Sequence, residues 1–360
     1  MEKNKLKLLL TGGGTGGHVF PMLAVVQAAR SLPSLEVEAV HLGTQAEVER
    51  RILAAAGIPS RQLSVGGLRG MNPVRLTRNA ARMAAAVRPA LQAIDEARPD
   101  VTFTSGGYVS APAVLASRLR RVPVLLFSAD VSAGLAIRTE ARLATRIALP
   151  VPEAVTGLPA GRTFVSGYPV RPELHSLPTR DEAKRALGFD PERLLLLVFG
   201  GSQGARALNQ AITAGLERLL TVTQVLHIAG ALDAPSLVPR PGYRIEAFLE
   251  EMPVALAAAD LAVCRAGAST LGELPAAGLP AILVPGPFAG GHQRHNAAVL
   301  ERAGGATVVA NERVGDELVD RTLALLAEPD RLATMSAAMR TQFRPDAARV
   351  IAEELVRLAA

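Results

Sequence analysis

Glycine-rich turns stand at three places in the chain where an anion could be bound. Residues 12–17, 105–108 and 200–204 each follow a short apolar run and precede a helical pattern. Glycine lets backbone N–H groups approach a phosphate closely, and the N-terminus of the following helix carries partial positive charge. For any one turn, a purely structural role is the simpler interpretation. Three such turns together favour a ligand that carries diphosphate groups.

The first turn also has the G-x-G-x-x-G spacing of dinucleotide-binding folds, through Gly12, Gly14 and Gly17. That fingerprint requires an acidic residue at the tip of the second strand, where this chain has Gly43. A nicotinamide enzyme is therefore disfavoured. The phosphate-binding loop (P-loop) of nucleoside triphosphatases is excluded too, because His18 stands where that loop requires lysine.

Single polar side chains supply further candidates. His18 directly follows the first turn, and the pKa of histidine suits a general base near neutrality. A histidine with only a structural role is the alternative. Gln293 and Asn296 follow an uncharged stretch and could bind sugar hydroxyls, or they could belong to a solvated loop.

The segment 267–273 allows two interpretations. Thr270 and Glu273 have the spacing of a capping box, and in that case they only begin a helix. In the alternative, Glu273 accepts hydrogen bonds from a ribose diol, while the N–H groups of residues 268–270 face a phosphate. Both interpretations hold together only if Glu273 turns away from the cap.

Neither a metal nor a cofactor is expected. No two aspartates are separated by a single residue, so the D-x-D motif of many nucleotide-sugar enzymes is missing. Helix N-termini, Ser202 and Arg171 are then expected to neutralise a leaving diphosphate. The one cysteine, Cys264, excludes an internal disulfide and a cysteine-based metal cluster.

These turns need sheets that carry them at one edge. In the first half the pattern predicts strands over 5–10, 37–42, 100–104 and 123–126, and helices over 21–30, 46–56 and 111–119. Strands that alternate with helices predict an α/β fold with a parallel sheet covered on both faces. Crossovers in such sheets are right-handed, so the loops after the strands gather at one edge.

The second half repeats this organisation. Prolines punctuate residues 150–172, where we place the domain boundary. Beyond it the pattern predicts strands over 193–199, 222–228, 243–245, 261–264 and 281–284, and helices over 205–220, 316–326, 331–343 and 347–358. The prediction is two doubly wound domains with the ligand site in a cleft between their loop edges.

Composition agrees with a soluble two-domain protein. The chain has 360 residues, of which 49% are apolar and 20% charged, and single cores stop growing near about 250–300 residues. The N-terminus is too short an apolar run for a secretory signal. The uncharged stretch 274–293 contains four prolines and cannot form one membrane-spanning helix.

Positive charge is concentrated in the first 170 residues, which hold 20 Lys and Arg against 11 Asp and Glu. Residues 61–94 contain six arginines and no acid, with apolar residues between them. Such a surface attracts anionic lipid headgroups or nucleic acid, or is only a solvated helix face. Aromatic residues make up 3% of the chain and tryptophan is absent, which disfavours nucleic acid.

Four motifs in this order resemble one family. They are Gly-Gly-Thr-Gly-Gly-His-Val-Phe-Pro at 13–21, Ser-Gly-Gly-Tyr-Val-Ser at 105–110, Phe-Gly-Gly-Ser-Gln-Gly-Ala-Arg at 199–206 and Cys-Arg-Ala-Gly-Ala at 264–268. Together they resemble the MurG family of bacterial transferases, which add N-acetylglucosamine (GlcNAc) from a uridine diphosphate donor to lipid I. The family has the GT-B fold of two Rossmann-like domains. The resemblance implies an acceptor and membrane-facing domain over 1–168 plus 344–360, and a UDP-GlcNAc-binding domain over 169–343.

The resemblance also implies site residues. His18 is the family's favoured general base. Phe248 would cap the uracil and the Leu249 backbone would read its edge. The implied donor set is Thr15, Gly16, Gly17, Asp130, Arg171, Ser202, Phe248, Leu249, Ala268, Ser269, Thr270, Leu271, Gly272, Glu273 and Gln293. The implied acceptor set is Gly13, Gly14, Ser105, Gly106, Gly107 and Tyr108.

The chain departs from the family at 127–130. The family has His-Glu-Gln-Asn there, whereas this chain has Phe-Ser-Ala-Asp. Asp130 accepts hydrogen bonds as the family's asparagine does, but its carboxylate cannot donate one. The absence of the family's glutamate and glutamine would affect how the acceptor is bound and positioned.

The implied activity is an inverting, metal-independent transfer of GlcNAc to the 4-hydroxyl of N-acetylmuramic acid (MurNAc) in lipid I, giving lipid II for peptidoglycan. The basic surface of residues 69–91 would then face anionic lipid at the cytoplasmic side of the bacterial membrane, as a peripheral contact. Two alternatives stay open. One is a GT-B transferase of a soluble acceptor, and the other is a nucleotide-sugar-binding protein without catalysis.

Overall fold

The structure is a computed structural model that describes residues 4–13, 16–43, 47–63, 65, 79, 81–201, 204–287 and 291–360. The chain forms two compact units. Unit 1 comprises residues 1–171 and 344–360, and unit 2 comprises residues 172–343. The division falls three residues beyond the expected 168/169 boundary. Arg171 stacks on Phe20 within unit 1, which ties the end of this segment to that unit.

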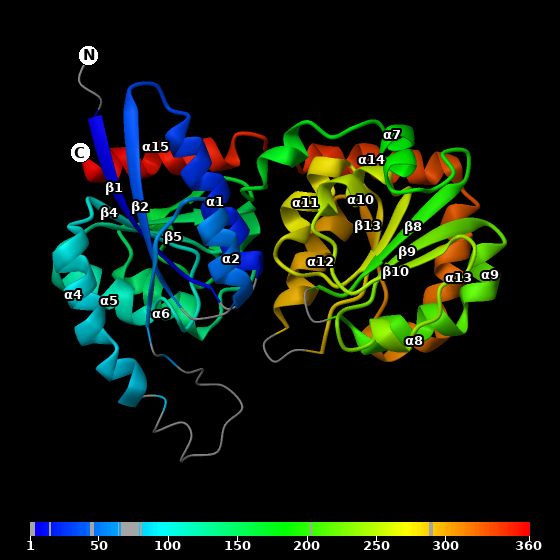
Figure 1. Ribbon diagram of the computed structural model, residues 1–360, viewed down its shortest axis with the longest axis horizontal. Helices are drawn as coiled ribbons and strands as arrows, with labels where there is room; N and C mark the ends of the chain where they lie inside the picture. Colours follow the sequence, from blue (N-terminus) through cyan, green and yellow to red (C-terminus); the bar gives the residue numbers. More distant parts are fainter. Residues whose placement is uncertain are drawn as a thin grey trace. The chain divides into compact units, whose positions relative to one another are not determined.

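The sheet of unit 1 is parallel throughout, and seven of its strands lie in the described residues (Figure 1). Their order is β3-β2-β1-β4-β5-β6-β7. At the centre, Thr11 of β1 pairs with Leu42 of β2 and with Thr104 of β4, so the loops after β1 and β4 begin side by side. The strands are β1 (Asn4–Thr11), β2 (Leu35–Gly43), β3 (Ser60–Gln62), β4 (Val101–Thr104), β5 (Val124–Phe127), β6 (Arg146–Leu149) and β7 (Thr163–Val165).

Two groups of helices cover this sheet (Figure 1). One group packs α2 and α15 against α1, and the other packs α4 and α6 against α5. The helices are α1 (Gly16–Arg30), α2 (Glu47–Ala55), α4 (Val87–Ala97), α5 (Ala111–Leu119), α6 (Leu135–Leu143) and α15 (Ala347–Ala359), with 3-10 turns η1 (Pro152–Val155) and η2 (Ala160–Arg162).

The last helix, α15, belongs to unit 1 although its residues follow the whole of unit 2. It packs against α1 and β4 and buries Ala347, Ile351, Ala352 and Leu355. Glu354 on the same helix forms an ion pair with Arg146 at 2.8 Å. Residues 344–360 therefore supply part of the core of unit 1.

Unit 2 repeats the architecture with a parallel sheet whose described strands number six, in the order β10-β9-β8-β11-β12-β13. The α/β class and the two doubly wound domains expected from the sequence are confirmed. The strands are β8 (Leu194–Phe199), β9 (Thr223–Ile228), β10 (Tyr243–Glu246), β11 (Leu261–Cys264), β12 (Ala281–Leu283) and β13 (Ala306–Val308).

Helices lie on both faces of this second sheet as well (Figure 1). A core cluster joins α8, α9 and α13 to β8, β9 and β11, with Leu196, Ile212 and Leu318 fully buried. The helices are α7 (Arg180–Ala186), α8 (Arg206–Ala214), α9 (Leu216–Leu220), α10 (Met252–Ala258), α11 (Thr270–Ala277), α12 (His292–Arg302), α13 (Val314–Leu326) and α14 (Pro329–Thr341). The 3-10 turns are η3 (Pro172–His175), η4 (Ala234–Ser236) and η5 (Asn311–Arg313).

Two helix predictions were wrong. The single helix expected over 205–220 is two helices, because Gly215 ends α8. A Cβ atom at Gly215 would lie 2.4 Å from the Val319 side chain, so this position must approach α13 closely. The helix expected from Pro21 begins at Gly16 instead. Pro21 therefore lies inside α1, as its sixth residue, where it cannot donate a hydrogen bond to the Gly17 carbonyl.

Among the helices that the structure describes, none is both long and apolar enough to cross a membrane.

Candidate functional site

The first glycine loop, residues 12–17, connects β1 to α1. Gly12 and Gly13 have φ angles of 130° and 145°, in a region that residues with a Cβ rarely adopt. A Cβ at Gly12 would lie 2.2 Å from Ser105 Oγ, so the loop also touches the second glycine loop. Gly14 and Thr15 lie outside the described residues. Gly16, Gly17 and His18 form the first turn of α1.

A buried histidine and glutamate lie under the first loop, and sequence reasoning missed both. His41 Nε2 is 3.1 Å from the Gly12 carbonyl oxygen and 3.2 Å from Glu49 Oε1. His41 Nδ1 lies 3.1 Å from the Ser60 hydroxyl. Burial lowers the pKa of His41, so the ring is neutral and donates through Nε2. His41 thus holds the Gly12 carbonyl, and Glu49 lies beside the same ring nitrogen. A Cβ at Gly13 would lie 2.3 Å from Glu49 Oε1.

The second glycine loop, residues 105–108, follows β4. Gly106 and Gly107 have φ angles of 79° and 107°. The Gly106 N–H donates to Thr104 Oγ1 at 2.9 Å, and a Cβ at Gly106 would lie 2.1 Å from the Ile137 side chain. Ser105 is buried, and its N–H donates to the Thr11 carbonyl at 3.1 Å. The structure therefore brings the two predicted acceptor loops together at the end of neighbouring strands.

Tyr108 and Asp130 border these loops. The Tyr108 side chain is 41% exposed. Asp130 is half-buried and lies beyond the end of β5, the neighbour of β4. Both predicted site residues thus lie at the carboxyl edge of the sheet in unit 1, where ligands of open α/β sheets bind.

Arg171 contacts an aromatic side chain. Its guanidinium carbon lies 4.4 Å from the centroid of the Phe20 ring, which is within the range of a cation–π contact. Phe20 stands two residues after His18, on α1. This pairing could not be predicted from the sequence, because 150 positions lie between the two residues.

The third glycine loop, residues 200–204, connects β8 to α8 in unit 2. Gly201 and Gly204 have φ angles of 87° and 75°, and the Gly204 N–H donates to the Gly201 carbonyl at 2.9 Å. A Cβ at Gly204 would lie 2.2 Å from the Ala229 carbonyl oxygen. Ser202, the predicted phosphate ligand, lies outside the described residues.

A buried polar network holds the Ala229 carbonyl beside this loop. Asn209 Nδ2 donates to that carbonyl at 2.9 Å, and Asn209 Oδ1 accepts from His227 Nε2 at 2.9 Å. The other ring nitrogen, Nδ1, lies 2.8 Å from the Tyr243 hydroxyl. Burial lowers the pKa of His227 to about 4, so the ring is neutral near pH 7. The neutral tautomer with Nε2–H satisfies both partners.

The segment 267–273 begins α11, but it does not form the expected capping box. Ser269 is the N-cap and makes no side-chain cap bond, and the Thr270 hydroxyl donates to the Gly267 carbonyl at 2.6 Å. The Thr270 N–H also donates to that carbonyl, at 3.1 Å, so it is already used within the turn. Glu273 lies half-buried in the first helical turn. The other residues of the predicted set precede it: Ala268 and Ser269 lie before the helix, and Leu271 and Gly272 lie in its first turn.

Gln293 and Asn296 do not belong to a solvated loop, because they lie in α12. Gln293 Oε1 accepts from the Gly286 N–H at 2.7 Å, so its carbonyl end holds the segment after β12. Asn296 is fully buried, and its Nδ2 donates to the Ala266 carbonyl at 3.1 Å. Asn296 therefore holds the backbone of the segment before α11 through this hydrogen bond.

Phe248 and Leu249 follow β10. Phe248 is 55% exposed, which is unusual for so large an apolar side chain, and Leu249 is half-buried. The segments after β8, β10, β11 and β12 all leave the same edge of the parallel sheet. Those predicted donor residues of unit 2 that the structure describes therefore follow strands at its carboxyl edge.

The described residues hold no group of three or more His, Cys, Asp or Glu side chains that could bind a metal ion. Cys264 is fully buried at the end of β11, and burial raises the pKa of its thiol. The thiol is therefore no nucleophile at neutral pH.

Of the predicted membrane surface 69–91, positions 69–78 and 80 lie outside the described residues. Arg82 and Arg88 are exposed. Leu91, one of the apolar residues between the arginines, is partly buried and packs against the core cluster that contains Ala90 and Ile94. In the described part of 69–91, Leu91 is therefore not a fully exposed member of the predicted membrane surface.

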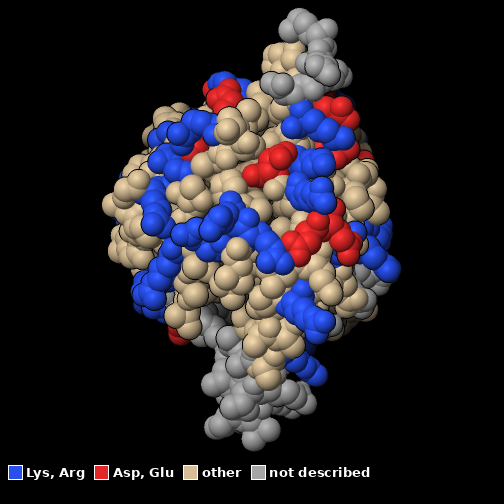
Figure 2. All heavy atoms as spheres, turned by 90° about the vertical axis from the view of Figure 1, so that its left-hand side faces the viewer, with Lys and Arg blue, Asp and Glu red and all other residues tan. Residues whose placement is uncertain are grey.

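Figure 2 shows the side of the molecule on which α4 and α5 lie, where Lys and Arg side chains gather across the face. Part of this charge is neutralised. Arg120 forms two hydrogen bonds of 2.6 Å with Asp95, and Arg61 pairs with Glu96. Arg118 and Arg121 are exposed.

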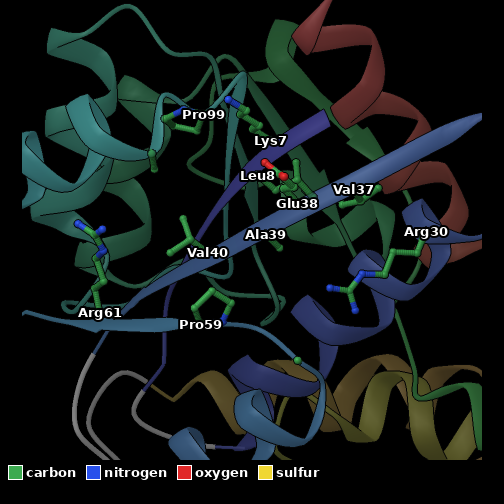
Figure 3. A pocket seen from close by; sticks show the side chains of 12 residues that line it. Lys7, Leu8, Arg30, Val37, Glu38, Ala39, Val40, Pro59, Arg61 and Pro99 are labelled. Atoms are coloured by element: carbon green, nitrogen blue, oxygen red, sulfur yellow. The ribbon is translucent and has the colours of Figure 1, made fainter. Parts of the chain in front are cut away.

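A groove of about 470 Å³ lies away from all the predicted site residues of unit 1. Lys7 and Leu8 of β1 and residues 37–40 of β2 line it, and Figure 3 shows Arg30 and Arg61 at its two ends. None of the glycine loops contributes to this groove.

Comparison with known proteins gives consistent matches over both units. The model of the glycosyltransferase family 28 N-terminal domain matches residues 8–149, and the model of the C-terminal domain matches residues 195–351. A protein of Mycolicibacterium vanbaalenii is 41% identical over 98% of this chain and 90% of its own length. A protein of a Nocardioides species is 38% identical over 97% of this chain and 98% of its own length. Both are named UDP-N-acetylglucosamine–N-acetylmuramyl-(pentapeptide) pyrophosphoryl-undecaprenol N-acetylglucosamine transferase.

Solved structures agree. The crystal structure of Acinetobacter baumannii MurG is similar with a TM-score of 0.74 and 26% identity, covering 98% of this chain and 99% of that one. The UDP-GlcNAc 2-epimerase of Neisseria meningitidis, bound to UDP-GlcNAc, has a TM-score of 0.72 at 13% identity and covers 98% of this chain and 100% of its own. That second likeness shows a common fold alone.

Proposed function

The chain belongs to the MurG family within glycosyltransferase family 28, and from this membership we propose which of its residues bind the two substrates and carry the reaction. The protein is an N-acetylglucosaminyltransferase of the GT-B fold. It transfers GlcNAc from UDP-GlcNAc to lipid I in peptidoglycan synthesis.

The acceptor diphosphate binds to the two glycine loops of unit 1. The observation that carries this proposal is the contact between Gly12 and Ser105, which joins the two loops into one surface at the ends of β1 and β4. Backbone N–H groups of the two loops bind phosphate oxygens, apart from those of Ser105 and Gly106, which donate to the Thr11 carbonyl and to Thr104 Oγ1. Tyr108, exposed beside them, contacts the acceptor sugar or its diphosphate.

The uridine diphosphate of the donor binds to the carboxyl edge of unit 2. Phe248 stacks on the uracil and the backbone of Leu249 reads its edge. The segment 268–272 and Ser202 bind the diphosphate, and Glu273 accepts from the ribose hydroxyls. Within this segment the N–H groups of Ala268 and Ser269 face the phosphates, because those of residues 270–272 are bonded within the turn. Ser269, and not Thr270, is the N-cap of α11, so Glu273 does not occupy the N3 position of a capping box.

The remaining contacts with the donor are made to its GlcNAc group and to its negatively charged diphosphate. Since Gln293 Oε1 already accepts from Gly286, its amide nitrogen is the group that donates to sugar hydroxyls. Asp130 accepts from the sugar, and Thr15, Gly16 and Gly17 lie near the same sugar. Arg171 neutralises the diphosphate, and the Phe20 ring keeps its guanidinium in one orientation.

The chemistry is a single displacement with inversion at the anomeric carbon. The 4-hydroxyl of MurNAc attacks this carbon, its proton passes to His18, and the bond to the β-phosphate oxygen of UDP breaks. Helix N-termini and Arg171 stabilise the negative charge that develops on the departing diphosphate. No divalent ion takes part in this scheme.

The protein binds the cytoplasmic face of the membrane as a peripheral protein, through residues 69–91. The exposed Arg82 and Arg88 support this proposal. Exposed arginines attract anionic headgroups with about 1 kcal/mol each.

The test is an assay of lipid II formation from UDP-GlcNAc and lipid I, with the product identified by mass and with EDTA in a parallel reaction. We expect product at equal rates in both reactions. A strict need for added divalent metal would contradict the scheme. Transfer to a water-soluble aglycone but not to lipid I would favour the soluble-acceptor alternative, and donor binding without any turnover would favour the non-catalytic one.

A further inference from the structure

Glu140 is a buried carboxyl group with no role in the scheme above. It lies on α6, on the same side as Ile137, Ala141 and Ala144, which pack into the core of unit 1. The residue is 1% exposed. At that position an apolar side chain would complete the buried stripe of the helix. A buried carboxyl group needs a specific partner to offset its desolvation.

That partner is Ser110, which also holds the second glycine loop. Ser110 Oγ lies 2.8 Å from Glu140 Oε1 and 2.7 Å from the Gly107 carbonyl oxygen. Gly107 is one of the two glycines with positive φ in that loop. A chain of two contacts thus runs from the core of unit 1 to the loop proposed to bind the acceptor diphosphate.

The number of protons decides how this chain is bonded. A serine hydroxyl carries one hydrogen, so Ser110 cannot donate to Gly107 and to Glu140 at the same time. If Glu140 is a neutral acid, its own hydrogen is donated to Ser110 Oγ, and the serine hydrogen is donated to Gly107. If Glu140 is ionised, the carboxylate takes the serine hydrogen and the Gly107 carbonyl loses its partner.

The surroundings of Glu140 favour the neutral acid. Within the described residues, its second oxygen, Oε2, has no hydrogen-bond partner. α6 packs against α5 and β5, and β5 carries no ionisable group. The charged groups on the two helices are Arg118, Arg138 and Arg142, and all three are exposed. Burial raises the pKa of Glu140 to about 8, against a smaller opposing effect of the Ser110 hydrogen bond.

We propose that Glu140 is a positioning residue for the acceptor: as a neutral acid it donates to Ser110, which is thereby free to donate to the Gly107 carbonyl and to hold the loop 105–108 in its binding conformation. This inference rests on the proposed role of that loop in binding lipid I. It predicts that the loop loosens when Glu140 ionises, and that lipid I binding weakens while donor binding does not.

The experiment measures KM for lipid I and for UDP-GlcNAc with the full chain. Glu140→Leu fills the same space without a donor, and Ser110→Ala removes the link. Each should raise the lipid I KM about five- to tenfold, the value of one hydrogen bond, and leave the UDP-GlcNAc KM within about twofold. Glu140→Gln retains an N–H donor to Ser110 and should keep the wild-type KM near pH 7.

The pH profile separates positioning from packing. In the wild type the lipid I KM should rise as the pH passes through about 8, since Glu140 then ionises. In Glu140→Gln this rise should be absent, because an amide does not ionise. If Glu140→Leu fails to fold, this profile and Ser110→Ala still decide the matter.

Ser117→Ala is the matched control. Ser117 is equally buried on α5, but its hydroxyl donates to Ala113, lies 2.8 Å from the Thr102 hydroxyl and does not touch the loop. An equal rise in lipid I KM for Ser117→Ala would overturn the inference, and so would identical pH profiles for Glu140→Gln and the wild type. Gly107→Ala tests the loop itself. If it leaves the lipid I KM unchanged, the proposed acceptor role of the loop is wrong, whereas a rise in Gly107→Ala without one in Glu140→Leu rejects only Glu140.

Discussion

The guanidinium carbon of Arg171 lies 4.4 Å from the centre of the Phe20 ring, so the charge proposed to face the donor diphosphate rests on an aromatic face. An arginine held in this way loses less side-chain freedom when it binds a phosphate. The ring belongs to the helix that also carries His18. Loss of the ring should therefore weaken donor binding although the charge remains.

We expect Phe20→Leu to raise the KM for UDP-GlcNAc about three- to tenfold, in line with about 1 kcal/mol for a cation–π contact. Arg171→Lys should have a larger effect, because lysine lacks the planar fork. Steady-state kinetics at saturating lipid I measures both. Phe164→Leu is the control, since Phe164 makes a similar contact with Arg146 at 5.2 Å. An unchanged KM in Phe20→Leu would show that the ring does not orient the guanidinium.

Phe248→Ala should raise the KM for UDP-GlcNAc at least about fivefold, because stacking on a base is worth about 1–3 kcal/mol. Competitive inhibition by free UDP should weaken by the same factor, since the uracil is common to both. Leu232→Ala removes another exposed apolar side chain of unit 2, 82% exposed, and should change neither constant. A Phe248→Ala enzyme with unaltered inhibition by UDP would reject the uracil contact.

His18→Ala should lower kcat by a factor of about 10² to 10⁴, the usual contribution of a general base. Part of the lost rate should return as the pH rises, because hydroxide makes the acceptor hydroxyl easier to deprotonate. KM values should change little. The measurement is kcat in a stopped-time assay at saturating concentrations of both substrates. Full activity of the variant would exclude His18 as the general base without affecting the assignment of the fold.

The combined change Arg82→Glu and Arg88→Glu should weaken binding to vesicles with anionic lipid by at least about tenfold at low salt. Sedimentation with vesicles measures this, and neutral vesicles give the baseline. Arg331→Glu alters an exposed arginine of unit 2 and should not change vesicle binding. Equal losses in both variants would indicate that net charge, and not this surface, determines membrane binding.

Acid should destabilise unit 2 through His227. Its pKa in the folded state, about 4, lies below the ordinary histidine value of 6.5, so the unfolded chain binds a proton first as the pH falls. The stabilising contribution of the neutral ring is therefore complete above pH 6.5 and is lost between pH 6.5 and about 4. The total is up to about 3 kcal/mol, at about 1.4 kcal/mol per pH unit.

Thermal unfolding between pH 7 and pH 4 measures this loss. His227→Gln should flatten the profile, because an amide does not titrate. A His175→Gln variant, with a histidine on the exposed turn η3, should keep the wild-type profile. Parallel profiles for His227→Gln and the wild type would show that other groups govern the acid transition.

Much of the fold could be predicted because its central strands are long and apolar. β8 is five leucines and valines in six residues, and a glycine turn follows it, so both its type and its end are visible in the sequence. β3 and β13 have only three residues each, which is too short for an alternating pattern to be recognised. α12 was missed because its first five residues are polar, and its buried side begins only at the fifth of them, Asn296.

The site shows the same division. Glycine turns are recognisable without a structure, because few other residues adopt a positive φ. The side chains that hold those turns are not. His41 contacts the first loop, and Glu140 is linked to the second through Ser110, and both come from other elements that meet the loops only after folding. One signal was present for Glu140. It interrupts an apolar stripe at helical spacing, and a charged residue there requires a partner.

The position of α15 has a consequence for synthesis on the ribosome. Because its buried face completes the core around α1 and β4, the nascent unit 1 lacks part of that core until residues 172–343 have been translated. Unit 2 is encoded without interruption and has all its strands before α15 emerges from the exit tunnel. Cotranslational folding is therefore expected to finish unit 2 first, with the half of the chain that was translated earliest maturing last.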